Sequence, residues 1–177
     1  LSMFHSLLSL RGTIVDPTLQ QLADAYILGY IGHYTLDTVC HPYIHYRTNK
    51  TSDKDENYIF GCHVFLETDI DGAVLAHYYR KKFSWFRAGH TVALPSWQKR
   101  FLAVFLARAI EIAYPGSLVF ATEIKGAILS TRLLYDLMED RHGWKKKLVR
   151  HIDHAIFHYA FLSPLIANDH LAHTTIP

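Results

Sequence analysis

The sequence predicts an all-α protein built as a multi-helix bundle. Apolar residues recur at helical spacing along several long segments, and prolines and glycines separate these segments. No stretch shows the sustained two-residue alternation, bounded by turn residues, that is typical of strands. A chain of 177 residues is long enough to form one domain with a hydrophobic core, so we expect a single helical domain over residues 1–177.

The first predicted helix begins at Asp16-Pro17, because Asp is a favoured N-cap and Pro is favoured at the first helical position. Pro42 disfavours helical backbone at the residue before it and lacks an N–H group. We therefore expect this helix to end near Cys40, with His41 at its frayed end. The chain begins without Met and without a basic segment followed by a cleavage site, so we expect its natural N-terminal segment to be missing, with a mature form as the alternative.

The polar run at residues 45–57 predicts a loop, and a second helix is expected at about residues 58–81. An aromatic-rich connection follows, and Pro95-Ser96 favours a new helix start. Pro115-Gly116 and His142-Gly143 separate the later helices, and Pro164 closes the last one. These later helices are expected at about residues 97–114, 119–140 and 145–160.

The composition excludes some classes of protein and leaves others open. Half of the residues are apolar and 19% are charged, and the net charge of +2 is too small to favour nucleic acid as a partner. No segment reaches the roughly 18 uninterrupted apolar residues of a membrane span, so we expect a soluble chain with at most peripheral membrane contact. Cys40 and Cys62 form no CxxC motif; we interpret them as small buried helix residues, with a disulfide as the alternative.

Two triplets of potential metal ligands share one spacing. In each triplet the three residues are four positions apart, which places them along one face of a helix. The triplets are His33, Asp37 and His41 in the first helix, and His63, Glu67 and Asp71 in the second. Two such stripes facing each other would form a metal site in a helical core.

Helix geometry divides the ligands between different ions. Residues at i and i+8 are about 12 Å apart along a helix, whereas metal–ligand bonds are only about 2.0–2.2 Å long. His33 and His41 should therefore serve different ions, so that two or more metals are expected. If the second helix returns antiparallel to the first, His41 lies near His63 and Glu67.

The remaining ligands form a half-site, in which His33 and Asp37 would need further ligands from elsewhere. Histidine and carboxylate ligands without thiolate suit a catalytic zinc or a similar ion. The alternative is that each residue alone is a satisfied core histidine or part of a buried ion pair. We favour the metal site because six such residues lie among apolar neighbours, where unpaired charge is costly.

Two segments resemble the zinc-dependent phospholipase C-like family. The family signature combines Gly-x-x-x-His, Leu-Asp and Cys-His-Pro-Tyr, and residues 29–46 are similar to it (GYIGHYTLDTVCHPYIHY). A His-x-x-x-Glu segment follows in the family, and residues 62–71 are similar to that segment (CHVFLETDID). The resemblance covers mainly residues 20–80. It implies an all-α fold shared with bacterial phospholipases C and single-strand nucleases, with up to three zinc ions that bind a phosphodiester and activate water. The family's ligand motif is matched by His33, Asp37, His41, His63 and Glu67.

The N-terminal part of the chain, before His33, departs from the family pattern. The classical enzymes take further ligands from an early His and an upstream Asp and His, and nothing before His33 matches them; His5 and Asp16 have no motif around them. The gap between Asp37 and His41 is also shorter than in the classical enzymes. The upstream Asp is the usual general base, so no catalytic residue is assigned.

Histidines near the C-terminus are given simpler interpretations. His151, His154 and His158 are interpreted as the polar face of an amphipathic helix. A second group near the end, Asp169, His170 and His173, is interpreted as part of a tail rather than of a site.

The sequence thus predicts a metal-dependent phosphoesterase that hydrolyses a phosphodiester or phospholipid by zinc-activated water. One alternative is another helical metallophosphohydrolase that acts on nucleotides. A further alternative is a non-catalytic protein whose helix pair is held together by metal. The sequence indicates neither the compartment nor the oligomeric state.

Overall fold

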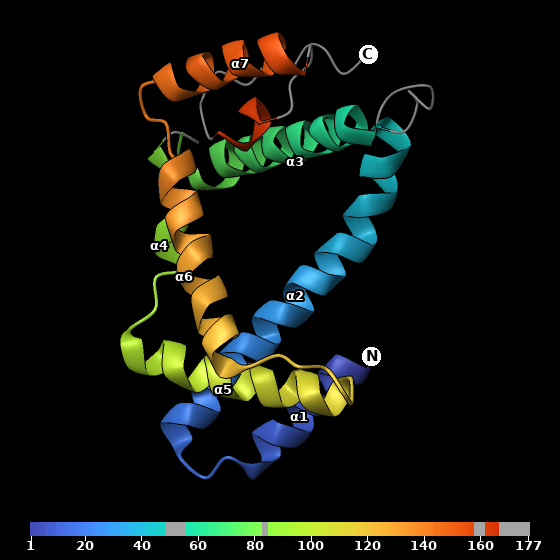
Figure 1. Cartoon of the computed structure of the whole chain (residues 1–177), viewed down its shortest axis with the longest axis vertical. Coiled ribbons are helices and arrows are strands. Elements are labelled where there is room, and N and C mark those ends of the chain that lie inside the picture. The colour runs from blue at the N-terminus through green and yellow to red at the C-terminus, as the bar shows by residue number, and fades with distance from the viewer. Residues whose placement is uncertain (49–55, 83–84, 158–161, 167–177) are drawn as a thin grey trace. The chain divides into compact units, whose positions relative to one another are not determined.

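The structure is a computed structural model that describes residues 1–48, 56–82, 85–157 and 162–166. Every regular element in these ranges is a helix, which confirms the all-α class (Figure 1). The elements are α1 (Ser2–Thr13), α2 (Pro17–Thr48), α3 (Glu56–Tyr79), α4 (Ala88–Thr91), α5 (Ser96–Ala113), α6 (Ala121–Met138), α7 (Trp144–Ile156) and the short 3₁₀ helix η3 (Ser163–Leu165). The helices predicted after residue 57 are found with their ends shifted by a few residues.

The chain divides into two compact units. Unit 1 consists of Leu1–Asp37 and Gly89–Leu133, and unit 2 consists of Thr38–Ala88 and Leu134–Pro177. Helix α2 passes from unit 1 to unit 2 after Asp37, and helix α6 passes between them after Leu133.

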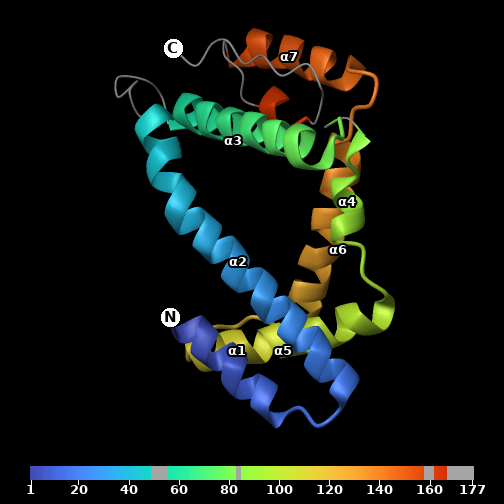
Figure 2. The same ribbon diagram turned by 180° about the vertical axis from the view of Figure 1, so that it is seen from behind.

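The core of unit 1 lies where α1 and α5 pack side by side and the first half of α2 joins them (Figure 2). Its buried residues are Leu7 from α1, Ala23 and Ile27 from α2, and Phe105, Leu106 and Ala109 from α5. Burial of these apolar side chains is the main stabilising contribution within this unit. Helix α1 was not predicted from the sequence, although its Leu7 is fully buried.

The predicted start of α2 is confirmed in atomic detail. The Asp16 carboxylate accepts hydrogen bonds from the backbone N–H groups of Thr18 and Leu19, at 2.7 and 3.1 Å. These are groups that have no partner inside the helix, so Asp16 acts as its N-cap. In the same unit, the Arg11 guanidinium donates two 2.7 Å hydrogen bonds to the Asp24 carboxylate and links α1 to α2.

The predicted end of this helix near Cys40 is wrong, because α2 continues through Pro42 to Thr48. A proline inside a helix costs about 3 kcal/mol, since it removes one hydrogen bond and crowds the preceding turn. The continuing turn buries Ile44 and Thr48, which are only 3% and 2% exposed. Burying an isoleucine contributes about 1.5–3 kcal/mol, which offsets much of that cost.

In unit 2, polar groups hold the ends of the helices. The buried Asp153 carboxylate of α7 accepts hydrogen bonds from the backbone N–H groups of Leu162 and Ser163, which fixes the chain just before and within η3. The Lys145 ammonium donates to the backbone carbonyls of Leu137 and Glu139 at the end of α6. A cation at this position also interacts favourably with the helix dipole.

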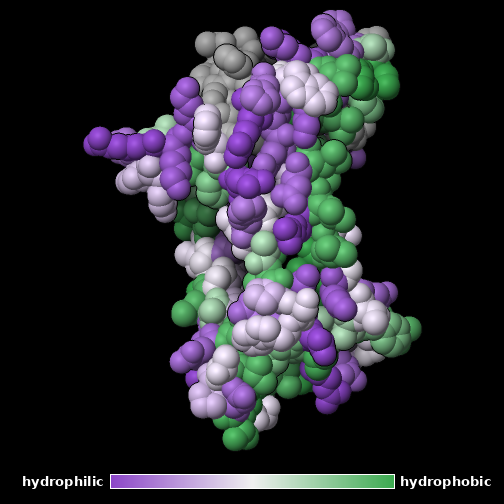
Figure 3. All heavy atoms as spheres, turned by 90° about the vertical axis from the view of Figure 1, so that its left-hand side faces the viewer, coloured by the Kyte–Doolittle hydropathy of each residue, from purple (hydrophilic) through white to green (hydrophobic). Residues whose placement is uncertain are grey.

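Many large apolar side chains remain exposed. Figure 3 shows hydrophobic residues at the surface beside hydrophilic ones on one face. Helix α6 buries none of its described residues. Its exposed apolar side chains include Leu129, Leu133, Leu134, Tyr135 and Leu137.

Candidate metal centre

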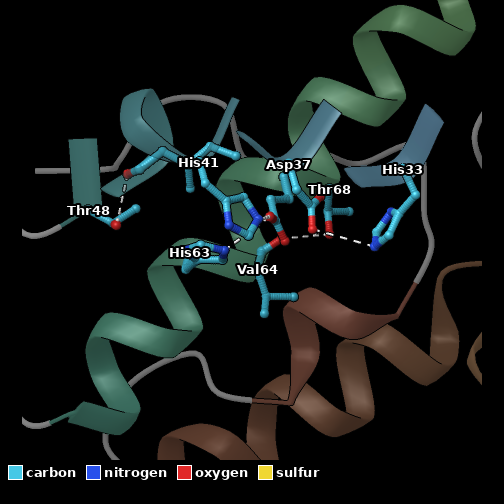
Figure 4. Close-up of polar contacts among 9 residues, drawn as sticks. His33, Asp37, His41, Thr48, His63, Val64 and Thr68 are labelled. Atoms are coloured by element: carbon cyan, nitrogen blue, oxygen red, sulfur yellow. Dashed lines mark hydrogen bonds and ion pairs between the residues drawn. The ribbon is translucent and has the colours of Figure 1, made fainter. Parts of the chain in front are cut away.

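Three of the predicted ligands converge where the last turns of α2 meet α3 in unit 2. His41 comes from α2, and His63 and Glu67 come from consecutive turns of α3. Figure 4 shows the rings of His41 and His63 pointing toward one another from the two helices. One ligand atom from each of these three residues lies within 4.8 Å of the others. They are called the His41–His63–Glu67 cluster below.

One carboxylate oxygen of Glu67 lies between the two imidazoles. Its Oε1 atom is 3.0 Å from Nε2 of His63 and 3.3 Å from Nε2 of His41. Two atoms bound to one tetrahedral ion at about 2.0–2.1 Å are separated by roughly 3.3 Å. The observed distances are close to that value, so an ion could enter with small side-chain rotations.

The shorter distance also suits a hydrogen bond between Nε2 of His63 and the Glu67 carboxylate. The cluster is half-buried: the side chain of His63 is 18% exposed, and those of His41 and Glu67 are 38% and 37% exposed. Water can therefore reach one side of the cluster. The structure thus brings together the three residues that the helix-return argument paired, and they could hold a metal ion.

The other half of the predicted ligand set forms a separate pair. Nε2 of His33 is 3.4 Å from a carboxylate oxygen of Asp37, one helical turn away on α2, and both side chains are well exposed. Both residues belong to unit 1, whereas the His41–His63–Glu67 cluster belongs to unit 2.

Asp71 is not part of the cluster. It lies on α3 one turn beyond Glu67 and is exposed. Partial desolvation raises the pKa of its carboxyl, and the negative charge of Glu67 raises it further.

His45 is a residue of this region that the sequence argument missed. It was assigned to a polar loop, but it lies on α2 one turn after His41. The centre of its ring is 5.5 Å from that of His41 and 5.1 Å from that of His63. The signal was present in the sequence as a continuation of the four-residue spacing, from position 41 to position 45.

The two cysteines next to the cluster are free, so the alternative of a disulfide is not realised, and they are half-buried rather than buried as predicted. Burial raises the pKa of the Cys62 thiol, and its hydrogen bond with Tyr58 opposes that effect only in part. A thiol with a raised pKa is a poor metal ligand, because the thiolate is the binding form. The donors that the structure brings together at the cluster are imidazole nitrogens and a carboxylate oxygen.

The remaining candidates lie elsewhere. His5 is exposed on α1, and the carboxylate of Asp16 is used as the N-cap of α2. His151 and His154 are exposed on α7, in agreement with a polar helix face. The other four residues, His158, Asp169, His170 and His173, lie outside the described residues.

Comparison of the chain with protein-family models, with curated proteins and with solved structures found no match. Among the helices of the described residues, none combines the length and the apolar character needed to cross a membrane.

Proposed function

We propose that this chain is a metal-dependent phosphoesterase whose ion is held by His41, His63 and Glu67. The observation that carries the proposal is the convergence of three ligand atoms from two helices within 4.8 Å. Two imidazoles and one carboxylate form the donor set of many catalytic zinc sites, in which the fourth position is left for water or substrate. The identity of the ion as zinc is part of the proposal.

The residues present fit such an ion in both chemistry and distance. When bound, zinc acts as a Lewis acid toward a phosphoryl oxygen and lowers the pKa of coordinated water toward neutrality. The neutral imidazoles of His41 and His63 supply nitrogen donors, and the Glu67 carboxylate offsets part of the positive charge. The Oε1 atom of Glu67 lies 3.3 Å from Nε2 of His41 and 3.0 Å from Nε2 of His63, so the three atoms that would bind the ion already lie close together.

The choice of a phosphodiester as substrate rests on the resemblance of residues 29–46 and 62–71 to the zinc-dependent phospholipase C-like family. In that family the substrate is a phospholipid or a related phosphodiester. His33 and Asp37 match the same motif and offer two ligands for a second ion. Two ligands are too few for a complete site, so this second ion requires further donors.

The experiment uses the purified chain, prepared at neutral pH without chelator. We expect elemental analysis to find at least one equivalent of zinc, and the thermal midpoint to fall when a chelator removes it. We also expect hydrolysis of a chromogenic phosphodiester. His63→Ala should lose the metal at the cluster and the hydrolysis.

His77→Ala is the matched control, because His77 is an exposed histidine on the same helix and lies outside the cluster. It should keep both metal and activity. A chain that binds no transition metal contradicts the proposal outright. Full loading without hydrolysis of lipid-type or nucleotide phosphodiesters would instead favour a non-catalytic helix pair held by metal, and preference for nucleotides would favour the second phosphohydrolase hypothesis.

A further inference from the structure

His45 lies beside the His41–His63–Glu67 cluster without an assigned role. Its ring centre is 5.1 Å from that of His63 and 5.5 Å from that of His41, and the rings of His41 and His63 are themselves 5.3 Å apart. The three imidazoles therefore form a nearly equilateral triangle.

That triangle has the size expected for three imidazoles on one ion. With a Zn–N bond of about 2.0–2.1 Å and a ring centre about 1.1 Å beyond the nitrogen, each ring centre lies roughly 3.2 Å from the metal. At a tetrahedral angle, two such ring centres are roughly 5 Å apart. All three observed separations are close to this value.

The spacing along the helices supports the same arrangement. His41 and His45 are four residues apart on α2, and His63 and Glu67 are four residues apart on α3. Two ligands at i and i+4 can share one ion, as the paired histidines of the HExxH motif do. Two such pairs on adjoining helices supply four donors.

The ring of His45 has no competing polar contact in the described part of the chain. Among the described residues it makes ring contacts with the two cluster histidines, but no hydrogen bond or ion pair. Its nitrogens do not belong to the group of ligand atoms that lie within 4.8 Å of one another, so binding requires its ring to rotate, and its exposure leaves room for that rotation.

We infer that His45 is the fourth protein ligand of the ion at the cluster, an inference that rests on the metal site proposed above. The ion then has three imidazoles and one carboxylate around it in the absence of substrate. His45 is the most exposed of the four, so it is the ligand that a phosphate oxygen would displace or join.

The inference is tested by counting imidazoles around the metal. X-ray absorption of the zinc-loaded wild-type chain should show three imidazoles, and the His45→Ala variant should show two. Loss of a residue that only orients a ligand typically lowers metal affinity about 10–100-fold. Loss of a ligand should therefore weaken zinc binding by about 100-fold, measured by competition with a chromophoric chelator. His77→Ala should change neither quantity.

The possible results separate the two proposals. A wild-type chain that binds zinc with two imidazoles, and whose affinity is unchanged in His45→Ala, would overturn the role of His45 and leave the three-residue site intact. A wild-type chain that binds no zinc would overturn the metal site itself. The imidazole count on the wild-type chain is decisive even without the variant.

Discussion

Leu7 provides the sharpest test of how unit 1 is held together. Its side chain is 0% exposed and packs in the core that α1, α2 and α5 share. Leu7→Ala removes three buried carbon groups, worth about 0.8 kcal/mol each, or about 2.4 kcal/mol in total. The cavity left behind adds to this loss, so the free energy of unfolding should fall by about 3–4 kcal/mol.

Leu8→Ala is the matched control, because Leu8 is the next residue of the same helix but is 57% exposed. Its change should stay within about 0.5 kcal/mol, as is usual at the surface. Both variants are measured by urea unfolding followed by far-ultraviolet circular dichroism, with the midpoint shifted and the slope unchanged. Equal losses in the two variants would refute the placement of α1 against α5.

Two further predictions concern polar contacts. Hydrogen bonding to Arg11 lowers the pKa of Asp24 below its ordinary value of 3.8, so the stability this pair contributes is present above about pH 4 and lost as the pH falls further. Asp24→Asn should therefore weaken the acid dependence of the urea midpoint, and an unchanged dependence would contradict this. Asp153→Ala should lower the free energy of unfolding by about 3 kcal/mol, since two backbone N–H groups lose their partner. His154→Ala, at the exposed neighbouring position, should change little in the same urea measurement.

The parts of the fold that were predictable are those with strong local signals. The Asp16-Pro17 start was predicted because a carboxylate N-cap and an N1 proline act within one turn of helix. The pairing of His41 with His63 and Glu67 was predicted from two facts. Residues four positions apart share one face of a helix, and the 21 residues between His41 and His63 are enough for the chain to turn back.

The parts that were missed depend on contacts distant in sequence. Helix α1 has no side-chain cap, and the burial of its Leu7 depends on residues of α5 about a hundred positions away. The helix through Pro42 is likewise maintained by burial of Ile44 and Thr48, which no local rule reveals. That one error removed His45 from consideration, because a residue assigned to a loop has no helix face to share with His41.

The number of protein ligands also bears on which function the cluster serves. Zinc sites that only stabilise a fold are normally closed by four protein ligands, whereas catalytic sites keep one position for water or substrate. The donor set with His45 has four ligands, yet it is not enclosed, since the side chains of His41 and Glu67 are more than a third exposed and His45 is exposed. His45 also lies in the last turn of α2, which ends at Thr48. Burial of Ile44 and Thr48 holds the backbone of this turn, but the His45 side chain itself is exposed, so it can move away from the ion by a side-chain rotation. Under the proposed assignment, His45 would therefore close the site at rest and open it to a phosphate oxygen, which would reconcile four donors with the proposed hydrolytic role.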